Sequence, residues 1–90
     1  MFDIQALGEE CFPDDPVVWS ARSVSERGGY HFVEAVAEPA TVGYPAFLLV
    51  VRVEGDRAGV AGGYCWTGRW QLLFSDPAYP TDWKAIPVNP

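Results

Sequence analysis

Short apolar or alternating stretches recur along the chain, and glycine or proline separates most of them. The strongest covers residues 46–54, where six apolar residues precede Arg and Glu alternating with Val. A first half that is apolar on both faces is typical of a strand in the middle of a sheet. We therefore expect a central strand here, with Phe47, Leu49 and Val51 buried.

Two stretches before this strand predict a hairpin. Residues 17–24 and 30–36 are rich in β-branched and aromatic residues, and Gly28 and Gly29 lie between them. A helix that begins at Ser25 is the alternative, but two glycines in its first turn would cost about 2 kcal/mol relative to alanine. The pattern therefore favours two strands.

After the central strand, residues 55–59 have the composition of a five-residue hairpin loop. Residues 60–66 then predict a return strand beside the central one, with Val60 buried. Gly62 and Gly63 indicate a bulge or a bend within this strand.

The next link predicts a tight turn. Thr67 and Gly68 form a two-residue connection to a last strand over residues 70–74, in which we expect Leu72 to be buried. This strand completes a meander of three strands that begins with the central one.

The ends of the chain are less regular. Residues 2–10 predict either a short helix or an edge strand. Residues 76–90 contain four prolines and predict an extended or turning tail that cannot enter a central ladder. We expect a single domain over residues 1–90 that is mainly β, or α+β with one short helix. Its one small antiparallel sheet of about five strands would hide its apolar faces by curling into a barrel, by pairing as a sandwich, or under one short helix.

Negative charge is concentrated at the N-terminal end. The chain has a net charge of −6, from 12 acidic and six basic residues, which argues against direct nucleic-acid binding. Residues 1–21 contain five acidic residues and no Lys or Arg. One interpretation, which assigns no specific function, is a solvated surface that aids solubility. The more specific interpretation is a surface that binds a basic partner. The five are Asp3, Glu9, Glu10, Asp14 and Asp15.

Few side chains are suited to catalysis or metal binding. Cys11 and Cys65 cannot supply the four ligands of a structural zinc site, and the acidic start lacks a secretory pattern. We therefore expect a cytoplasmic protein with free thiols, no metal, no cofactor and no membrane segment. His31 is the single histidine, and a Cys65–His31 enzyme is the least favoured hypothesis.

These observations favour a non-catalytic protein-binding module. The most concrete form is an inhibitor, of the kind that phages and mobile elements encode, that occupies the basic nucleic-acid-binding surface of a partner protein. The alternative is a structural or assembly protein that pairs through edge strands or through its tail. The expected partner-binding residues are Glu9, Glu10, Asp14, Asp15 and the aromatic residues Trp70, Tyr79 and Trp83.

Overall fold

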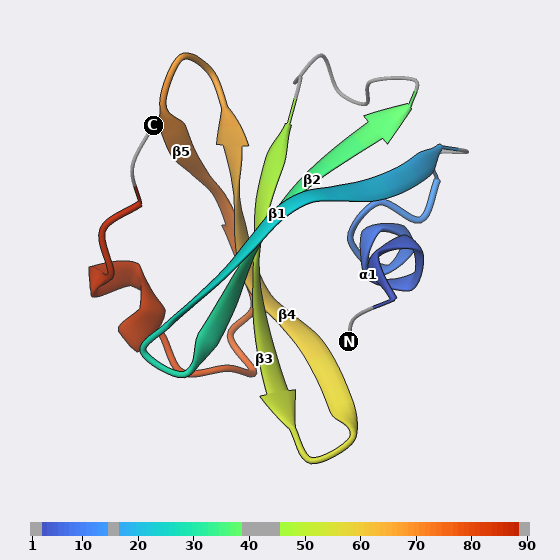
Figure 1. The fold of residues 1–90 in the computed structure, drawn as a ribbon. Coiled ribbons are helices and arrows are strands. Elements are labelled where there is room, and N and C mark those ends of the chain that lie inside the picture. Colours follow the sequence, from blue (N-terminus) through green and yellow to red (C-terminus); the bar gives the residue numbers. More distant parts are fainter. Residues whose placement is uncertain (1–2, 15–16, 39–45, 89–90) are drawn as a thin grey trace.

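The computed structural model describes residues 3–14, 17–38 and 46–88 (Figure 1). No helix in these ranges is long and apolar enough to cross a membrane. The elements in these ranges, in chain order, are α1 (Ile4–Cys11), β1 (Val18–Arg27), β2 (Tyr30–Glu38), β3 (Phe47–Glu54), β4 (Arg57–Trp66), β5 (Trp70–Ser75) and the short 3-10 helix η1 (Asp82–Ala85).

The strands form one antiparallel sheet in the order β1-β2-β3-β4-β5. The prediction of a mainly β protein with one short helix is confirmed. The sheet is open rather than closed into a barrel, and two covering elements hide its faces instead. Helix α1 packs on one face, here called the helix face. Residues 76–88, here called the C-terminal segment, pack on the opposite tail face (Figure 1).

Glycines with positive φ form the tight turns. Gly28 and Gly29 have φ angles of 58° and 84°, and together they connect β1 to β2 as the predicted first hairpin. The predicted five-residue loop at residues 55–59 is wrong. Glu54 pairs directly with Arg57, so the turn contains only two residues between them. Hydrogen bonding between the strands thus continues further than the turn-like composition indicated.

The turn between β4 and β5 is longer than predicted. Trp66 pairs with Trp70, so three residues form this turn rather than two. The Thr67 backbone N–H donates to the Arg69 carbonyl at 3.0 Å, and Gly68 has a φ of 96°. The two tryptophan rings meet edge to face, with their centroids 5.1 Å apart.

A close contact between backbone and ring seats α1 on the helix face. Gly8 is buried, and a Cβ added there would lie 2.4 Å from the Trp19 indole. The Gln5 side chain donates to the Val17 carbonyl and accepts from the Trp19 backbone N–H, at 3.0 and 2.8 Å. Phe12 stacks on Trp19 with centroids 5.6 Å apart. The helix is therefore fixed against β1.

The C-terminal segment is fixed to the tail face by one large side chain. Trp83 is 0% exposed and lies over Gly62, whose added Cβ would be 2.4 Å from its indole. Tyr30 donates a 2.5 Å hydrogen bond to Asp82. The Pro87 carbonyl accepts from Arg27 at 2.6 Å. The turning tail expected from four prolines thus includes one short 3-10 helix.

Most of the predicted core is confirmed, and one residue is wrong. Leu72 is 48% exposed, because β5 is an edge strand and no described residue covers this position. A register shift after Gly63 leaves Leu73 as an extra residue in β5, next to the predicted irregularity. The predicted core residues that are buried are Phe47, Leu49, Val51 and Val60.

Candidate interaction surfaces

The N-terminal acidic residues differ in whether their carboxylates have a partner within the fold. Asp3 caps α1, since its carboxylate accepts from the Ala6 backbone N–H at 3.1 Å. Glu9, Glu10 and Asp14 are exposed, and no hydrogen bond or ion pair engages their carboxylates within the described ranges. Asp15 lies outside the described residues. We call Glu9, Glu10 and Asp14 the N-terminal acids.

Two of these acids lie where the helix disfavours them. Glu9 and Glu10 are in the last turn of α1, which contains no basic residue. The C-terminal end of a helix carries a partial negative charge, so each carboxylate there costs up to about 1 kcal/mol. Burial, and then the charge of Glu10, raise the pKa of the adjacent Cys11 thiol to about 11. The helix thus carries acids in positions that local stability does not favour.

All ion pairs found among the described residues lie on the sheet. Arg52 pairs with Glu54 at 3.3 Å, and His31 lies 3.3 Å from Glu26. The third pair joins Arg22 to Glu34 at 3.2 Å. None of them uses an N-terminal acid, so the negative charge of α1 is not neutralised by contact.

A cleft at the β3–β4 hairpin brings together two of the predicted binding residues. Glu10 from α1 and Tyr79 from the C-terminal segment line the same cavity of about 450 Å³. Arg52 also lines it, but already contacts Glu54 and donates to the Tyr30 hydroxyl. Arg57 is the exposed cation of the cleft, and its side chain forms no ion pair with a described residue. The remaining lining residues are Glu54, Ala58 and Gly59.

The other aromatic residues predicted to bind a partner do not line this cleft. Trp70 is half-buried and packs against the apolar cluster of the tail face, opposite to α1. Trp83 belongs to the same cluster and has no exposed surface. Trp70 therefore lies on the face of the sheet opposite to α1, and Trp83 fixes the C-terminal segment in this structure.

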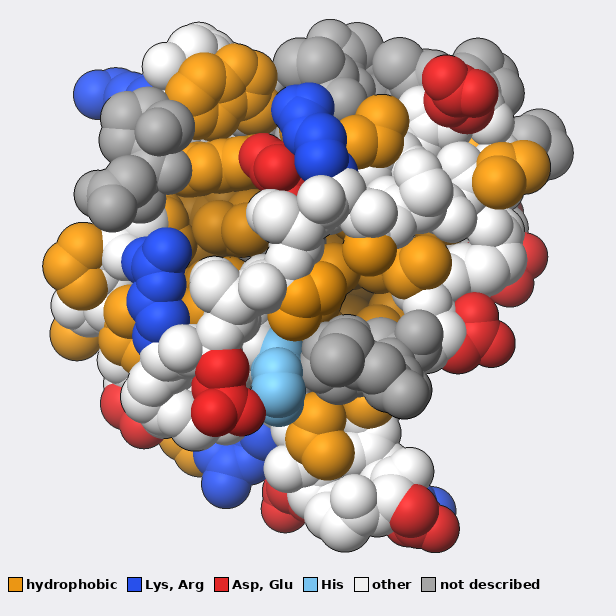
Figure 2. All heavy atoms as spheres, viewed as in Figure 1, with side chains coloured by type: hydrophobic (Ala, Val, Ile, Leu, Met, Phe, Trp, Pro, Cys, Tyr) orange, Lys and Arg blue, Asp and Glu red, His pale blue; other side chains and the backbone are white. Residues whose placement is uncertain are grey.

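A groove on the tail face was not predicted from the sequence. Two adjoining cavities, of about 190 and 270 Å³, share Glu34 and Trp70 in their linings. Figure 2 shows hydrophobic side chains gathered in a hollow beside one acidic and one basic side chain. The apolar residues that line the two cavities are Phe32, Ala46, Leu48, Trp66, Trp70 and Val88.

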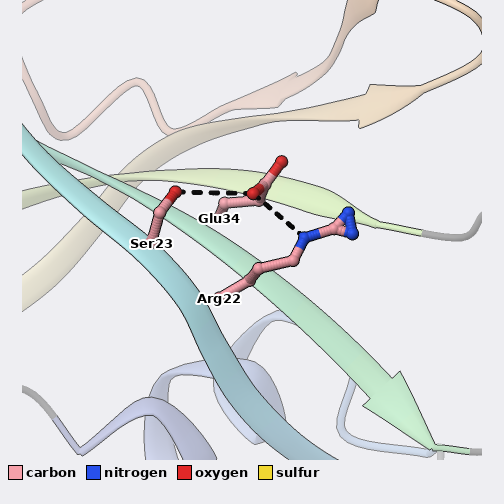
Figure 3. Close-up of polar contacts among 3 residues, drawn as sticks. All are labelled: Arg22, Ser23 and Glu34. Carbon is pink, nitrogen blue, oxygen red and sulfur yellow. Dashed lines mark hydrogen bonds and ion pairs between the residues drawn. The ribbon is translucent and has the colours of Figure 1, made fainter.

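A polar cluster lies in this groove. Arg22 and Ser23 of β1 point toward Glu34 of β2, with distances of 3.2 and 3.4 Å to its carboxylate (Figure 3). A bulge leaves Arg22 without a residue opposite it in β2. The sequence signal was Glu34 itself, an acid that interrupts the otherwise apolar alternation of β2.

The single histidine and the buried cysteine have other contacts. His31 lies beside Glu26, and the Cys65 thiol donates to the Gln71 carbonyl at 3.7 Å. Both cysteines are free, and the described residues contain no group of three metal-ligating side chains.

Comparison with known proteins assigns no family. No protein-family model matches the chain, and no curated protein or solved structure matches it either.

Proposed function

We propose that the protein is a non-catalytic protein-binding module whose N-terminal acids contact a basic surface of a partner. In its most specific form it is an inhibitor, of the kind that phages and mobile elements encode, and it occupies the surface with which the partner binds nucleic acid. The observation that carries this proposal is the exposure of Glu9, Glu10 and Asp14 without any ion pair among the described residues.

The position of the acids supports a role outside the fold. Carboxylates in the last turn of α1 oppose the helix dipole, so they do not serve the stability of the helix. Unneutralised charge on one side of a small protein produces a field that steers an oppositely charged partner and raises the association rate.

The hairpin cleft gives this surface a specific contact. A lysine or arginine of the partner that enters beside Glu10 would meet a free carboxylate and the Tyr79 hydroxyl. Arg57 lies in the same cleft and would favour an acidic group of the partner next to that cation. The cleft thus favours a partner surface that is basic overall but not uniformly so.

A comparison of two triple variants tests the proposal. The first, Glu9→Gln, Glu10→Gln and Asp14→Asn, removes the N-terminal acids. The control, Glu26→Gln, Glu38→Gln and Asp56→Asn, removes the same number of exposed carboxylates from positions outside α1 and outside the lining of the cleft. Each protein is used as bait in extracts of the native host at low and physiological salt, and captured proteins are identified by mass spectrometry.

The association rate with the captured partner then decides. We expect the first variant to associate about tenfold more slowly at low salt, with a flatter salt dependence, and the control to retain most of the wild-type rate. Wild-type protein should also displace nucleic acid from the partner, and the first variant should do so poorly. Equal association rates for the two variants would contradict the proposal.

A further inference from the structure

The two edge strands of the sheet differ in their protection against pairing. Strand β1 carries three charged side chains, Arg22, Glu26 and Arg27, and a bulge at Arg22, and both features discourage the addition of another strand. Strand β5 contains no charged residue, and its Leu72 and Leu73 are 48% and 37% exposed. No described residue pairs with the outer edge of β5. Such an edge offers unpaired backbone groups and apolar side chains to a second strand.

We propose that β5 pairs in an antiparallel manner with β5 of a second copy of this chain, which would join two sheets into one. The sequence from Arg69 to Asp76 is complementary to itself in this direction. When Leu72 lies opposite Leu73 of the partner subunit, Arg69 lies opposite Asp76 of the partner subunit, and the symmetry repeats this pair. Both charges flank a neutral, apolar strand, and opposite charges across paired strands stabilise the pairing.

The faces of the sheet on which the β5 side chains lie are consistent with this register. Trp70 packs against the tail-face cluster, and Ser75 lies on the same face because it pairs with Gly62, whose other partner is Val50 of that cluster. The proposed register places Trp70 opposite Ser75 of the partner subunit, so both side chains lie on one face.

The next pair also agrees. Gln71 pairs with Cys65 of the helix-face cluster, and Phe74 packs against that cluster. These two positions lie opposite each other in the proposed register. In a regular strand, residues 71 and 74 would point to opposite faces. The extra residue Leu73 brings them to the same face, so the bulge makes this register consistent.

The distribution of charge favours self-association through the β5 edge over other surfaces of the chain. Two copies with a net charge of −6 each repel one another, whereas Arg69 and Asp76 balance the charge locally at β5. A six-residue strand is short, so the interface falls at the small end of the usual range and the dimer should be weak. This inference does not depend on the proposed function, because the N-terminal acids take no part in it.

Sedimentation velocity over a range of concentrations tests the dimer. We expect the mass to rise from 9.9 kDa toward twice that value between about 10 μM and about 1 mM. Leu72→Lys should raise the dissociation constant by about tenfold or more, because it places a cation at the centre of the apolar pairing. Val24→Lys is the matched control, since Val24 is 40% exposed on the opposite edge strand, and it should leave the dissociation constant unchanged.

A charge exchange tests the register. Arg69→Asp places two acids opposite each other, and Asp76→Arg places two arginines opposite each other, so each variant alone should be monomeric. An equimolar mixture restores two opposite-charge pairs and should form a heterodimer. The Asp76 carboxylate accepts from the Ala78 backbone N–H, so circular dichroism must first show that Asp76→Arg is folded.

Four results would overturn the inference. These are a monomer at every concentration, a dimer that Leu72→Lys does not weaken, a dimer that Val24→Lys weakens equally, and a mixture of two folded charge variants that stays monomeric. If Asp76→Arg does not fold, Arg69→Asp in the exposed turn decides alone, and it must raise the dissociation constant by about tenfold or more.

Discussion

On both faces of the sheet, a glycine packs against a tryptophan ring where the covering element meets the strands. The two faces differ in which of these residues belongs to the sheet and which belongs to the cover. On the helix face the tryptophan, Trp19, belongs to the sheet, and the glycine beneath it, Gly8, belongs to the covering helix. On the tail face the glycine, Gly62, belongs to the sheet and Trp83 belongs to the covering segment. In both cases an added Cβ would lie 2.4 Å from the indole ring.

The exchange follows from the structure of the two covers. The glycine lets the backbone of α1 come close to the flat Trp19 ring, and α1 adds Leu7 to a helix-face cluster whose large side chains come mostly from the strands. The C-terminal segment contains one four-residue 3-10 helix and brings its own large side chain. It adds the Tyr30–Asp82 and Arg27–Pro87 hydrogen bonds. We therefore expect the tail-face cover to depend on a few contacts.

Val50 and Val51 give the strongest test that both faces are parts of the core. They are consecutive in β3, both are 0% exposed, and they belong to the tail-face and helix-face clusters respectively. An unpaired carboxylate at either position should cost more than about 5 kcal/mol, the lower end of domain stability. Val50→Asp and Val51→Asp should therefore both be unfolded by circular dichroism. A native spectrum and melting temperature for one of them would remove its face from the core.

The two glycines compare the covers directly. At Gly62 a methyl group meets the Trp83 ring and also the Phe74 carbonyl at 2.9 Å, a backbone atom that cannot move aside. Gly62→Ala should cost about 2–3 kcal/mol in the free energy of unfolding. Gly8→Ala should cost about 1–2 kcal/mol, because alanine's helix propensity offsets part of the overlap with Trp19.

Denaturant titration measures both variants, and hydrogen exchange shows where the loss falls. Protection should decrease mainly in η1 for Gly62→Ala and mainly in α1 for Gly8→Ala. A larger loss of stability for Gly8→Ala than for Gly62→Ala would reverse the comparison between the two covers.

The strands and the Gly28–Gly29 turn could be predicted from the sequence pattern, but the lengths of the two later turns could not. Residues 46–54 encode burial on both faces in their apolar run, and β3 is the central strand. Turn length depends on where pairing stops, and Arg57 continues the ladder although its neighbours have loop composition. Leu72 was misassigned for a related reason, since alternation does not say whether another element covers a strand.

The interaction surfaces were predictable only where charge decides exposure. Glu9, Glu10 and Asp14 are exposed, as an unpaired acidic run requires. Trp83 lies between Asp82 and Lys84, so its local sequence resembles a surface turn, and its burial depends on a distant glycine in β4. Arg22 and Glu34 are twelve residues apart, so their contact follows only from the register of β1 with β2, which the sequence pattern does not give.

A smaller effect tests the hydrogen bond that fixes the C-terminal segment. The hydrogen bond to Asp82, and then burial, raise the pKa of Tyr30, and burial raises that of Tyr64, also on the tail face. A raised pKa in the folded state stabilises the protein below the unfolded value near 10, and this contribution is lost as pH rises further. Stability should therefore fall at alkaline pH, and the fall should be smaller in Tyr30→Phe.

The same variant removes the hydrogen bond to Asp82 and also the one from Arg52, so it should cost about 1–2 kcal/mol at neutral pH. Thermal unfolding between pH 7 and pH 11 measures both effects. Cys11 also has a raised pKa, on the other side of the sheet, so the comparison is made in a Cys11→Ser background. An unchanged alkaline fall in Tyr30→Phe would show that the tail face does not govern it.

The smallest expected change in stability is a gain on removing the charge of Glu9. The same variant shows whether this acid affects the stability of the fold and the rate of binding in opposite directions. Glu9 is exposed in the last turn of α1, where its charge opposes the helix dipole. Glu9→Gln removes that charge at nearly constant size, so the helix-face cover should become more stable by about 0.3–1 kcal/mol. The same change should slow association with a basic partner, because it weakens the field of the N-terminal acids.

Glu38→Gln is the control. It removes an exposed acid outside the helix, so it should change neither the stability nor the association rate. Denaturant titration and association kinetics on the two variants measure both effects. If Glu9→Gln is more stable and binds as fast as the wild type, the acid serves neither the fold nor the partner, and the interface should be sought in the groove beside Trp70.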